Sequence, residues 1–252
     1  MSWQDAPLPV FRAGPLGWLR VLWRGTAMSL VTYGGLVLLL LARLVEAPLF
    51  GPARPFTPRI SQFVCRTNCT ILGLRRVVRG RPMAQKGAVV ANHSSWLDIF
   101  TLNACDRVYF VAKAEVSGWP GIGWLARATG TVFIRRKGVD AKVQQDIFET
   151  RLRQGHRLLF QAFFTHGLDR VLFIQPVTVV YHAPEGQDAR FYGWWGDMDF
   201  AGHLWKMLAA PRHGHVEIVF HPEVPVDGFE DRKALAQHCE RVIRTSHLLA
   251  VE

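Results

Sequence analysis

One uncharged stretch near the N-terminus, residues 25–42, places the strongest constraint on how this chain can fold. Its sequence, GTAMSLVTYGGLVLLLLA, contains no charged side chain and lies between Arg24 and Arg43. Its length is at the lower limit of a membrane-spanning helix, which needs about 20 apolar residues. Trp18 and Trp23 precede it, and tryptophan beside basic residues is typical of a membrane interface. We therefore predict attachment to a membrane, through a single span, a re-entrant helix or a helix that lies in the interface.

The balance of charge is strongly basic. The 252 residues include 30 Lys and Arg against 20 Asp and Glu, a formal net charge of +10. Such an excess indicates an anionic partner, either nucleic acid or a membrane with anionic lipids. The basic residues are scattered and form no recognisable nucleic-acid-binding motif. We therefore predict an anionic membrane as the partner and no nucleic acid.

The cysteines indicate a reducing compartment. No two of them form a C-x-x-C pair, and no cluster of Cys and His has zinc spacing. The apolar stretch is also not followed by a convincing signal-peptide cleavage site. We interpret the cysteines as reduced, mostly buried thiols, which places the protein on the cytoplasmic side of its membrane. The four are Cys65, Cys69, Cys105 and Cys239.

A proline-rich segment divides the chain into two parts. Residues 46–58, EAPLFGPARPFTP, contain four prolines, which is typical of a linker. We predict that residues 1–55 hold membrane-attachment helices and this linker. Residues 56–252 are predicted to form one catalytic α/β domain.

Apolar strands alternate with helical patterns through the second part. This alternation, with nearly continuous apolar strands, predicts a largely parallel or mixed central sheet flanked by helices. The predicted strands cover residues 87–91, 107–112, 131–135, 156–160, 171–181 and 215–222. The predicted helices cover residues 60–74, 97–104, 122–129, 139–154 and 232–249.

The segment ANHSSWLD, residues 91–98, carries the most specific chemistry. His93 follows a buried strand, and Ser94 and Ser95 are predicted to cap a helix whose first turn contains Asp98. A carboxylate bonded to one imidazole nitrogen fixes the tautomer and makes the other nitrogen more basic. That arrangement suits a general base acting on a hydroxyl group. The alternative is a histidine held in a turn and an acid that only caps a helix.

This segment resembles the first motif of the glycerolipid acyltransferase superfamily, which includes the 1-acyl-glycerol-3-phosphate acyltransferases. YFVAKAEV, with Lys113 and Glu115, resembles the segment that follows that motif. GTVFIRR resembles the second motif, with Gly130, Phe133, Ile134 and Arg136 at its positions, and IQPVTVVY resembles the fourth, built around Pro176. ANHSSWLDI and VYFVAKAEVSGWP also resemble the bacterial lyso-ornithine lipid acyltransferases.

The resemblance implies an O-acyltransferase without a cofactor. The acyl donor would be an acyl carrier protein or coenzyme A thioester, and the acceptor would be the hydroxyl of a lysolipid. His93 would act as the general base and Asp98 would orient it. The inner membrane of a bacterium, at its cytoplasmic face, would be the location.

Further side chains are predicted to bind substrate. By resemblance these are Asn92, Ser94, Lys113 and Arg136, and we add Arg135 because a guanidinium group binds phosphate through two hydrogen bonds. The alternative for the arginines is a solvated basic rim, and for Lys113 an ion pair with Glu115. His213, His215 and His221 lack a further ligand of defined geometry, so we predict no metal site.

One motif of the family is absent. Phe-Pro-Glu-Gly-Thr should follow the strand that ends at Phe160, but the sequence continues there with QAFFTHGLD. Either the protein lacks this loop, or a segment is missing from the sequence between Phe160 and Gln161. In the first case the alternative function is a catalytically impaired, membrane-bound lipid-binding relative. The aromatic segment YGWWGDMDF, residues 192–200, is interpreted as packing or as a wall facing the acceptor.

Overall fold

An eight-stranded mixed sheet forms the centre of the protein, which confirms the predicted fold class. The computed structural model describes residues 11–134, 147–148, 150–152, 154–160, 173–196 and 198–251. The strand order is β1-β7-β6-β2-β5-β3-β4, with β8 paired to β6. The strands are β1 (Arg75–Arg79), β2 (Gly87–Ala91), β3 (Tyr109–Lys113), β4 (Val132–Ile134), β5 (Leu158–Phe160), β6 (Phe173–His182), β7 (His215–Phe220) and β8 (Val224–Pro225).

Five neighbouring strands, β6, β2, β5, β3 and β4, run parallel to one another. β7 and β8 pair with β6 in the antiparallel direction, and β1 runs parallel to β7. Within the parallel part, Val90 pairs with Phe160 on one side and with Pro176 on the other. The carboxyl ends of these five strands therefore meet at one edge of the sheet. In open α/β sheets, ligands bind outside such an edge.

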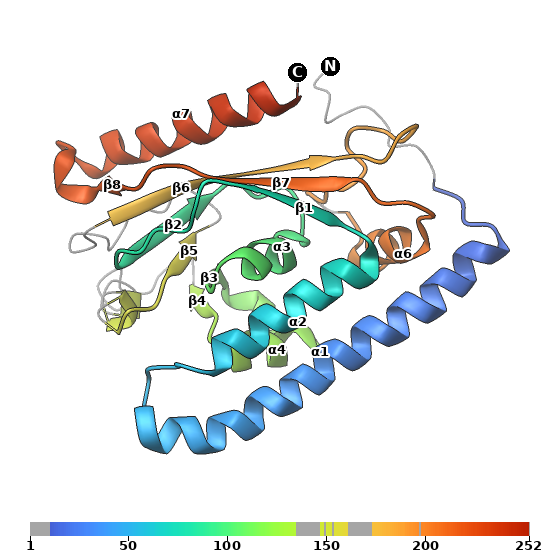
Figure 1. Ribbon diagram of the computed structural model, residues 1–252, viewed down its shortest axis with the longest axis horizontal. Helices are drawn as coiled ribbons and strands as arrows, with labels where there is room; N and C mark the ends of the chain where they lie inside the picture. The colour runs from blue at the N-terminus through green and yellow to red at the C-terminus, as the bar shows by residue number, and fades with distance from the viewer. Residues whose placement is uncertain are drawn as a thin grey trace.

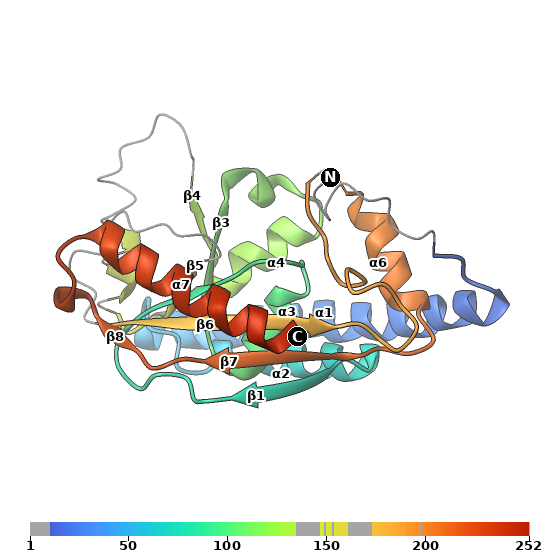
Figure 2. The same cartoon turned by 90° about the horizontal axis from the view of Figure 1, so that it is seen from above.

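Helices cover both faces of the sheet (Figures 1 and 2). Ala88 and Val90 of β2 belong to the apolar cluster that includes residues of α7 (Arg232–Val251). Val89 and Ala91 belong to the cluster on the opposite face. Because successive side chains of a strand point to opposite faces, this alternation is the expected one for a strand buried on both sides. The helices of the second face are α1 (Pro15–Phe50), α2 (Thr57–Leu72), α3 (Asp98–Cys105) and α6 (Phe200–Ala209).

The uncharged stretch of the sequence lies inside α1, a 36-residue helix that packs against the body. Among the described residues α1 is the one helix long and apolar enough to cross a membrane, and an 18-residue window of it has a mean hydropathy of 1.9. α2 returns antiparallel beside it, and Asn68 Nδ2 donates to Thr32 Oγ1 at 2.9 Å. A Cβ atom at Gly35 would collide with Val64, so this glycine permits the close approach of the two helices.

The predicted linker is shorter than expected, because α1 continues through Pro48 to Phe50. A proline inside a helix removes one N–H donor, and here the helix ends within a few residues of it. Glu46 then holds the turn into α2. Its buried carboxylate accepts hydrogen bonds from Phe56 N at 2.7 Å, Thr57 Oγ1 at 2.7 Å and Arg43 Nη1 at 3.1 Å.

We expect Glu46→Ala to lower the free energy of unfolding by about 2–3 kcal/mol, because hydrogen bonds to a buried charge are lost together. Thermal unfolding in detergent micelles measures this. Glu46→Gln keeps one carbonyl acceptor and should lose less. Equal stability of Glu46→Ala and the wild type would show that α1 and α2 stay together without this contact.

Most other predicted elements are present with small shifts. The helix predicted at 122–129 is α4 (Ile122–Thr129), the helix at 97–104 begins one residue later, and the helix at 232–249 is α7. The helix predicted at 139–154 lies partly outside the described residues. The sequence interpretation missed β1, β8, α6 and two short 3-10 helices, η1 (Ala114–Gly118) and η2 (Val226–Gly228).

Candidate active site

The turn after β2 carries the candidate site, at the carboxyl edge of the parallel strands. Asn92 fixes this turn to the neighbouring strand β6. Its Nδ2 donates to Val179 O at 2.8 Å, and its Oδ1 accepts from Val179 N at 2.8 Å. Both polar groups of the amide are thus used within the protein. The contact of Asn92 with substrate that we predicted from the sequence stays a prediction.

The structure brings His93 and Asp98 together, as the sequence spacing predicts. His93 Nδ1 lies 2.6 Å from Asp98 Oδ2. The His93 side chain is 38% exposed, whereas the Asp98 side chain is fully buried at the start of α3. The carboxylate can hold a proton only on Nδ1, which leaves Nε2 as the nitrogen for an approaching hydroxyl group.

The predicted helix caps are wrong in detail. Neither Ser94 nor Ser95 caps α3, which begins at Asp98 without a side-chain cap. Ser95 Oγ accepts from Leu97 N at 3.3 Å in the turn before the helix, and Ser94 N and Ser95 N donate to Asp98 Oδ2 at 3.1 and 3.2 Å. The carboxylate therefore shapes the turn that presents His93.

Tyr181, at the end of β6, completes the surroundings of Asp98. Its hydroxyl donates to Asp98 Oδ1 at 2.8 Å, the oxygen that His93 does not use. Thr101 Oγ1 lies 3.3 Å from the same hydroxyl. Burial raises the pKa of the Tyr181 hydroxyl well above its ordinary value, and the negative charge of Asp98 adds to the shift. Tyr181 therefore stays protonated and acts as a donor.

A family model described as Acyltransferase matches residues 75–226, which contain this turn and all eight strands of the described sheet. The chain belongs to the acyltransferase family. It is 56% identical over 246 residues to a lyso-ornithine lipid O-acyltransferase of Rhodobacter capsulatus, with 90% of this chain and 89% of that protein covered. A lyso-ornithine lipid O-acyltransferase of Pseudomonas aeruginosa is 31% identical, with 90% and 93% covered.

A solved structure shares the fold of this acyltransferase. The crystal structure of the 1-acyl-sn-glycerophosphate (LPA) acyltransferase PlsC from Thermotoga maritima matches with a TM-score of 0.60 and 18% identity. The match covers 93% of this chain and 95% of that one. The two proteins thus share one fold over nearly the whole of both chains.

The turn that carries His93 also contacts an aromatic segment of the chain. Trp194 N donates to Ser94 O at 2.9 Å, which attaches the segment 192–200 to the turn. Trp96 Nε1 donates to His203 Nδ1 of α6 at 2.9 Å, and its ring packs edge-on against Phe200. These contacts support the packing interpretation of the aromatic segment.

Lys113 ends β3 at the same edge of the sheet and is exposed. β3 is separated from β2 by β5, so Lys113 lies about 10 Å to the side of β2, two strand spacings of about 4.8 Å. Among the described residues it forms no ion pair with Glu115, so the structural alternative proposed for Lys113 gains no support, and its contact with substrate stays a prediction. Arg135 and Arg136 lie outside the described residues, directly after the last residue of β4, Ile134.

The missing third motif belongs to the same edge. Phe160 is the last residue of β5 and pairs with Val90, so it lies beside the strand that leads to His93. The junction of Phe160 and Gln161 lies outside the described residues. The alignment with the Rhodobacter capsulatus enzyme is 246 positions long, but it covers only 90% of the 252 residues of this chain, which is fewer than 246 residues. That relative therefore has residues within the matched region that this chain lacks, in agreement with the absent motif.

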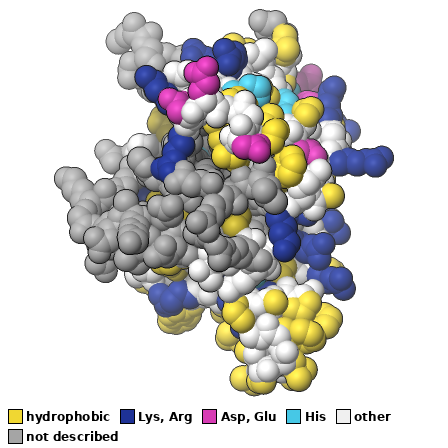
Figure 3. Space-filling view, turned by 90° about the vertical axis from the view of Figure 1, so that its left-hand side faces the viewer, with side chains coloured by type: hydrophobic (Ala, Val, Ile, Leu, Met, Phe, Trp, Pro, Cys, Tyr) yellow, Lys and Arg dark blue, Asp and Glu magenta, His cyan; other side chains and the backbone are white. Residues whose placement is uncertain are grey.

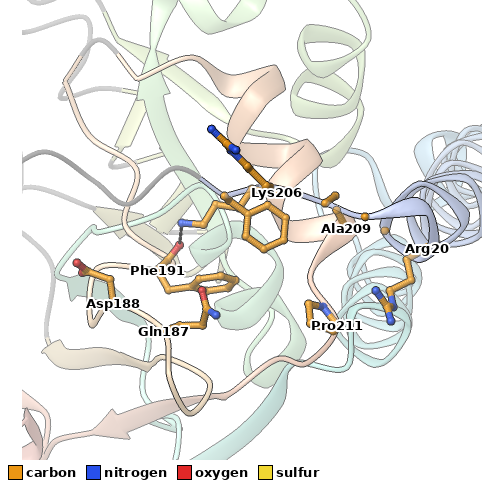
Figure 4. A pocket seen from close by; sticks show the side chains of 12 residues that line it. Arg20, Gln187, Asp188, Phe191, Lys206, Ala209 and Pro211 are labelled. Carbon is orange, nitrogen blue, oxygen red and sulfur yellow. Dashed lines mark hydrogen bonds between the residues drawn. The ribbon is translucent and has the colours of Figure 1, made fainter.

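A separate cavity of about 380 Å³ lies between the start of α1 and α6 (Figure 4). Arg20, Phe191 and Lys206 are among its lining residues. The amine of Lys206 donates to Phe191 O at 2.7 Å and lies 4.4 Å from the centre of the Phe191 ring. None of its lining residues belongs to the turn around His93, so this cavity does not contain the candidate chemistry.

In the described part of the chain, no three His, Cys, Asp or Glu side chains are grouped to hold a metal ion. Burial raises the pKa of the thiols of Cys65 and Cys105, to about 12 and about 11. These thiols are therefore poor nucleophiles.

Proposed function

We propose that this acyltransferase moves a fatty acyl group from an acyl carrier protein or coenzyme A thioester to the free hydroxyl of lyso-ornithine lipid. The 2.6 Å contact between His93 Nδ1 and Asp98 Oδ2 at the carboxyl edge of the sheet carries this proposal. The names of the two relatives that match over nine-tenths of this chain support the acceptor. Lysophosphatidic acid is the second candidate, because a 1-acyl-sn-glycerol-3-phosphate acyltransferase of Neisseria gonorrhoeae is 27% identical over 66% of this chain.

His93 performs the proton transfers in the proposed mechanism. Its Nε2 accepts the proton of the lysolipid hydroxyl as the oxygen attacks the thioester carbonyl. The carbon–sulfur bond then breaks, and the departing thiolate takes the proton back from the imidazolium. The products are the diacylated lipid and the free thiol of the carrier. Asp98 holds the imidazole in one tautomer throughout.

The polar head of the acceptor is assigned to the basic edge of the sheet. We assign Lys113, Arg135 and Arg136 to the anionic group of the acceptor or to the phosphate of the carrier's phosphopantetheine arm. Ser94 lies in the turn that carries His93, where its backbone N–H donates to Asp98. Lyso-ornithine lipid carries a carboxylate and one free amine instead of a phosphate, so a guanidinium–carboxylate contact would bind its anionic group.

The membrane is assigned to the outer face of α1. Leu30, Leu41 and Leu44 are 70%, 56% and 72% exposed, and 11% of the most apolar window of the helix is buried. Figure 3 shows hydrophobic side chains gathered at the lower end of the molecule, where α1 ends and α2 begins, with Lys and Arg side chains above them.

The opposite side of α1 packs against the body. In its first half Arg24 contacts the C-terminal end of α6, and near its C-terminal end Glu46 contacts the start of α2. The helix is about 54 Å long, which exceeds the thickness of about 30 Å of a bilayer core. We therefore assign it to the interface at the cytoplasmic face, in preference to a complete span.

A transfer assay tests the proposal. Purified protein in mixed micelles receives a labelled acyl carrier protein thioester, or acyl coenzyme A, with lyso-ornithine lipid or lysophosphatidic acid. We expect labelled ornithine lipid as the main product, identified by its mass. Preferential formation of phosphatidic acid would assign the other acceptor. Binding of both lysolipids without any product would contradict the proposal and support the catalytically impaired alternative.

A further inference from the structure

We propose that Tyr181 is a positioning residue for the proton transfer, acting on His93 through Asp98. This inference rests on the proposed role of His93 and adds to it Tyr181, the last residue of the segment IQPVTVVY, to which the resemblance assigns no role. Tyr181 lies 83 positions from Asp98 in the chain and meets it through the pairing of β2 with β6. It contacts neither the imidazole nor the solvent-facing side of the turn in any hydrogen bond that the described residues form.

The carboxylate of Asp98 is held by four donors on its two oxygens. Oδ2 accepts from His93 Nδ1 and from the backbone N–H groups of Ser94 and Ser95. Oδ1 accepts from the Tyr181 hydroxyl at 2.8 Å. Because Asp98 is fully buried, water cannot replace a lost donor on Oδ1. The Tyr181 hydroxyl is thus the side-chain donor that sets the orientation of the carboxylate plane and shares its negative charge.

Removing this hydroxyl has two predictable effects on His93. The carboxylate can rotate, so Nε2 points less often at the acceptor hydroxyl. Without the Tyr181 donor, the negative charge of Asp98 is less stabilised on Oδ1 and attracts the His93 ring more strongly, which stabilises the protonated imidazole. The acid limb of the pH–rate profile should therefore move to higher pH.

The other groups near this contact stay neutral over the range of such a profile. Burial raises the pKa of Cys69 on α2 and raises that of Tyr192 to about 12. Burial, with the nearby charges of Lys206 and Arg24 respectively, lowers the pKa of His203 and of His213 to about 4. Thr101 on α3 does not titrate. The acid limb should therefore report on His93 and Asp98.

The test compares Tyr181→Phe with Tyr192→Phe in the acyl transfer assay. Tyr192 is a matched control, because the centre of its ring lies 5.3 Å from that of Tyr181 and the residue is only 1% exposed. Its hydroxyl bonds to Gly214 N and His213 Nδ1 and does not reach Asp98. We expect Tyr181→Phe to lower kcat about tenfold or more, since a hydrogen bond to a charged group is lost. KM should change little, and the acid limb of kcat/KM should move to higher pH.

The control variant should keep both kcat and the acid limb, even where its thermal stability falls. Equal effects of the two substitutions would reduce Tyr181 to a packing residue and overturn the inference. So would an unmoved acid limb in Tyr181→Phe. His93→Ala, assayed alongside, separates the two hypotheses: if it retains turnover, the proposed base is wrong, whatever Tyr181 does. If it is inactive while Tyr181→Phe is unaffected, only the positioning role fails.

Discussion

His93→Ala should lower the rate of acyl transfer by about two to four orders of magnitude, the usual contribution of a general base. The side chain is 38% exposed, and its hydrogen bond in the described residues is the one to Asp98. Its loss should therefore leave the fold intact. The KM values of donor and acceptor should change little, because the imidazole acts on the transferred proton and does not hold a headgroup. Transfer of a labelled acyl group under saturating substrate measures the effect.

His238→Ala is the matched control for this substitution. His238 lies on α7, on the opposite face of the sheet, and its ring packs against Phe229 at 5.2 Å. We expect it to keep wild-type turnover. A normal rate in His93→Ala, with thermal unfolding like that of the wild type, would show that another group takes the proton. Tyr181 could not then be acting through this histidine.

The sequence alone predicted the strand that carries the site and the histidine–acid pair, because both depend on local patterns. The apolar run Gly87–Ala91 is β2, and five residues from His93 to Asp98 are enough to make the turn. The caps were wrong for a physical reason. A serine followed by a helix normally caps it with its side chain, but here a buried carboxylate takes the backbone N–H groups of Ser94 and Ser95.

The sequence could not predict the contacts made across the sheet. Tyr181 is the next-to-last residue of an apolar strand, and nothing within β6 indicates that its hydroxyl faces a carboxylate. β1 was missed because RRVVR has only two apolar residues, as suits a strand at the edge of the sheet. α6 could have been found. Asp199 caps it by accepting from Gly202 N at 2.5 Å, a signal hidden within a segment interpreted as an aromatic corner.

Replacing Leu30 and Leu44 together by glutamate should release the protein from phospholipid vesicles. These two residues lie about four helical turns apart on α1, a spacing that puts them on one face, and are 70% and 72% exposed. Each leucine contributes about 1.5–3 kcal/mol when buried in an apolar phase, and a carboxylate in its place opposes insertion. Wild-type protein should stay bound in high salt. Salt screens the attraction between charges, over about 8 Å at physiological ionic strength, but it does not weaken apolar contacts. Flotation of vesicles through a density gradient measures the bound fraction.

Leu248→Glu together with Leu249→Glu is the matched control, because these leucines are 53% and 70% exposed near the end of α7. α7 covers the face of the sheet opposite α1, so this variant should remain on the vesicles. The α1 variant should also keep its fold, since neither substituted leucine belongs to the buried clusters of the described residues. Release of both variants would mean that the added negative charge weakens binding wherever it lies. Release of the wild type by salt alone would make the attachment electrostatic, and the outer face of α1 would then have no part in holding the active site at the lipid surface.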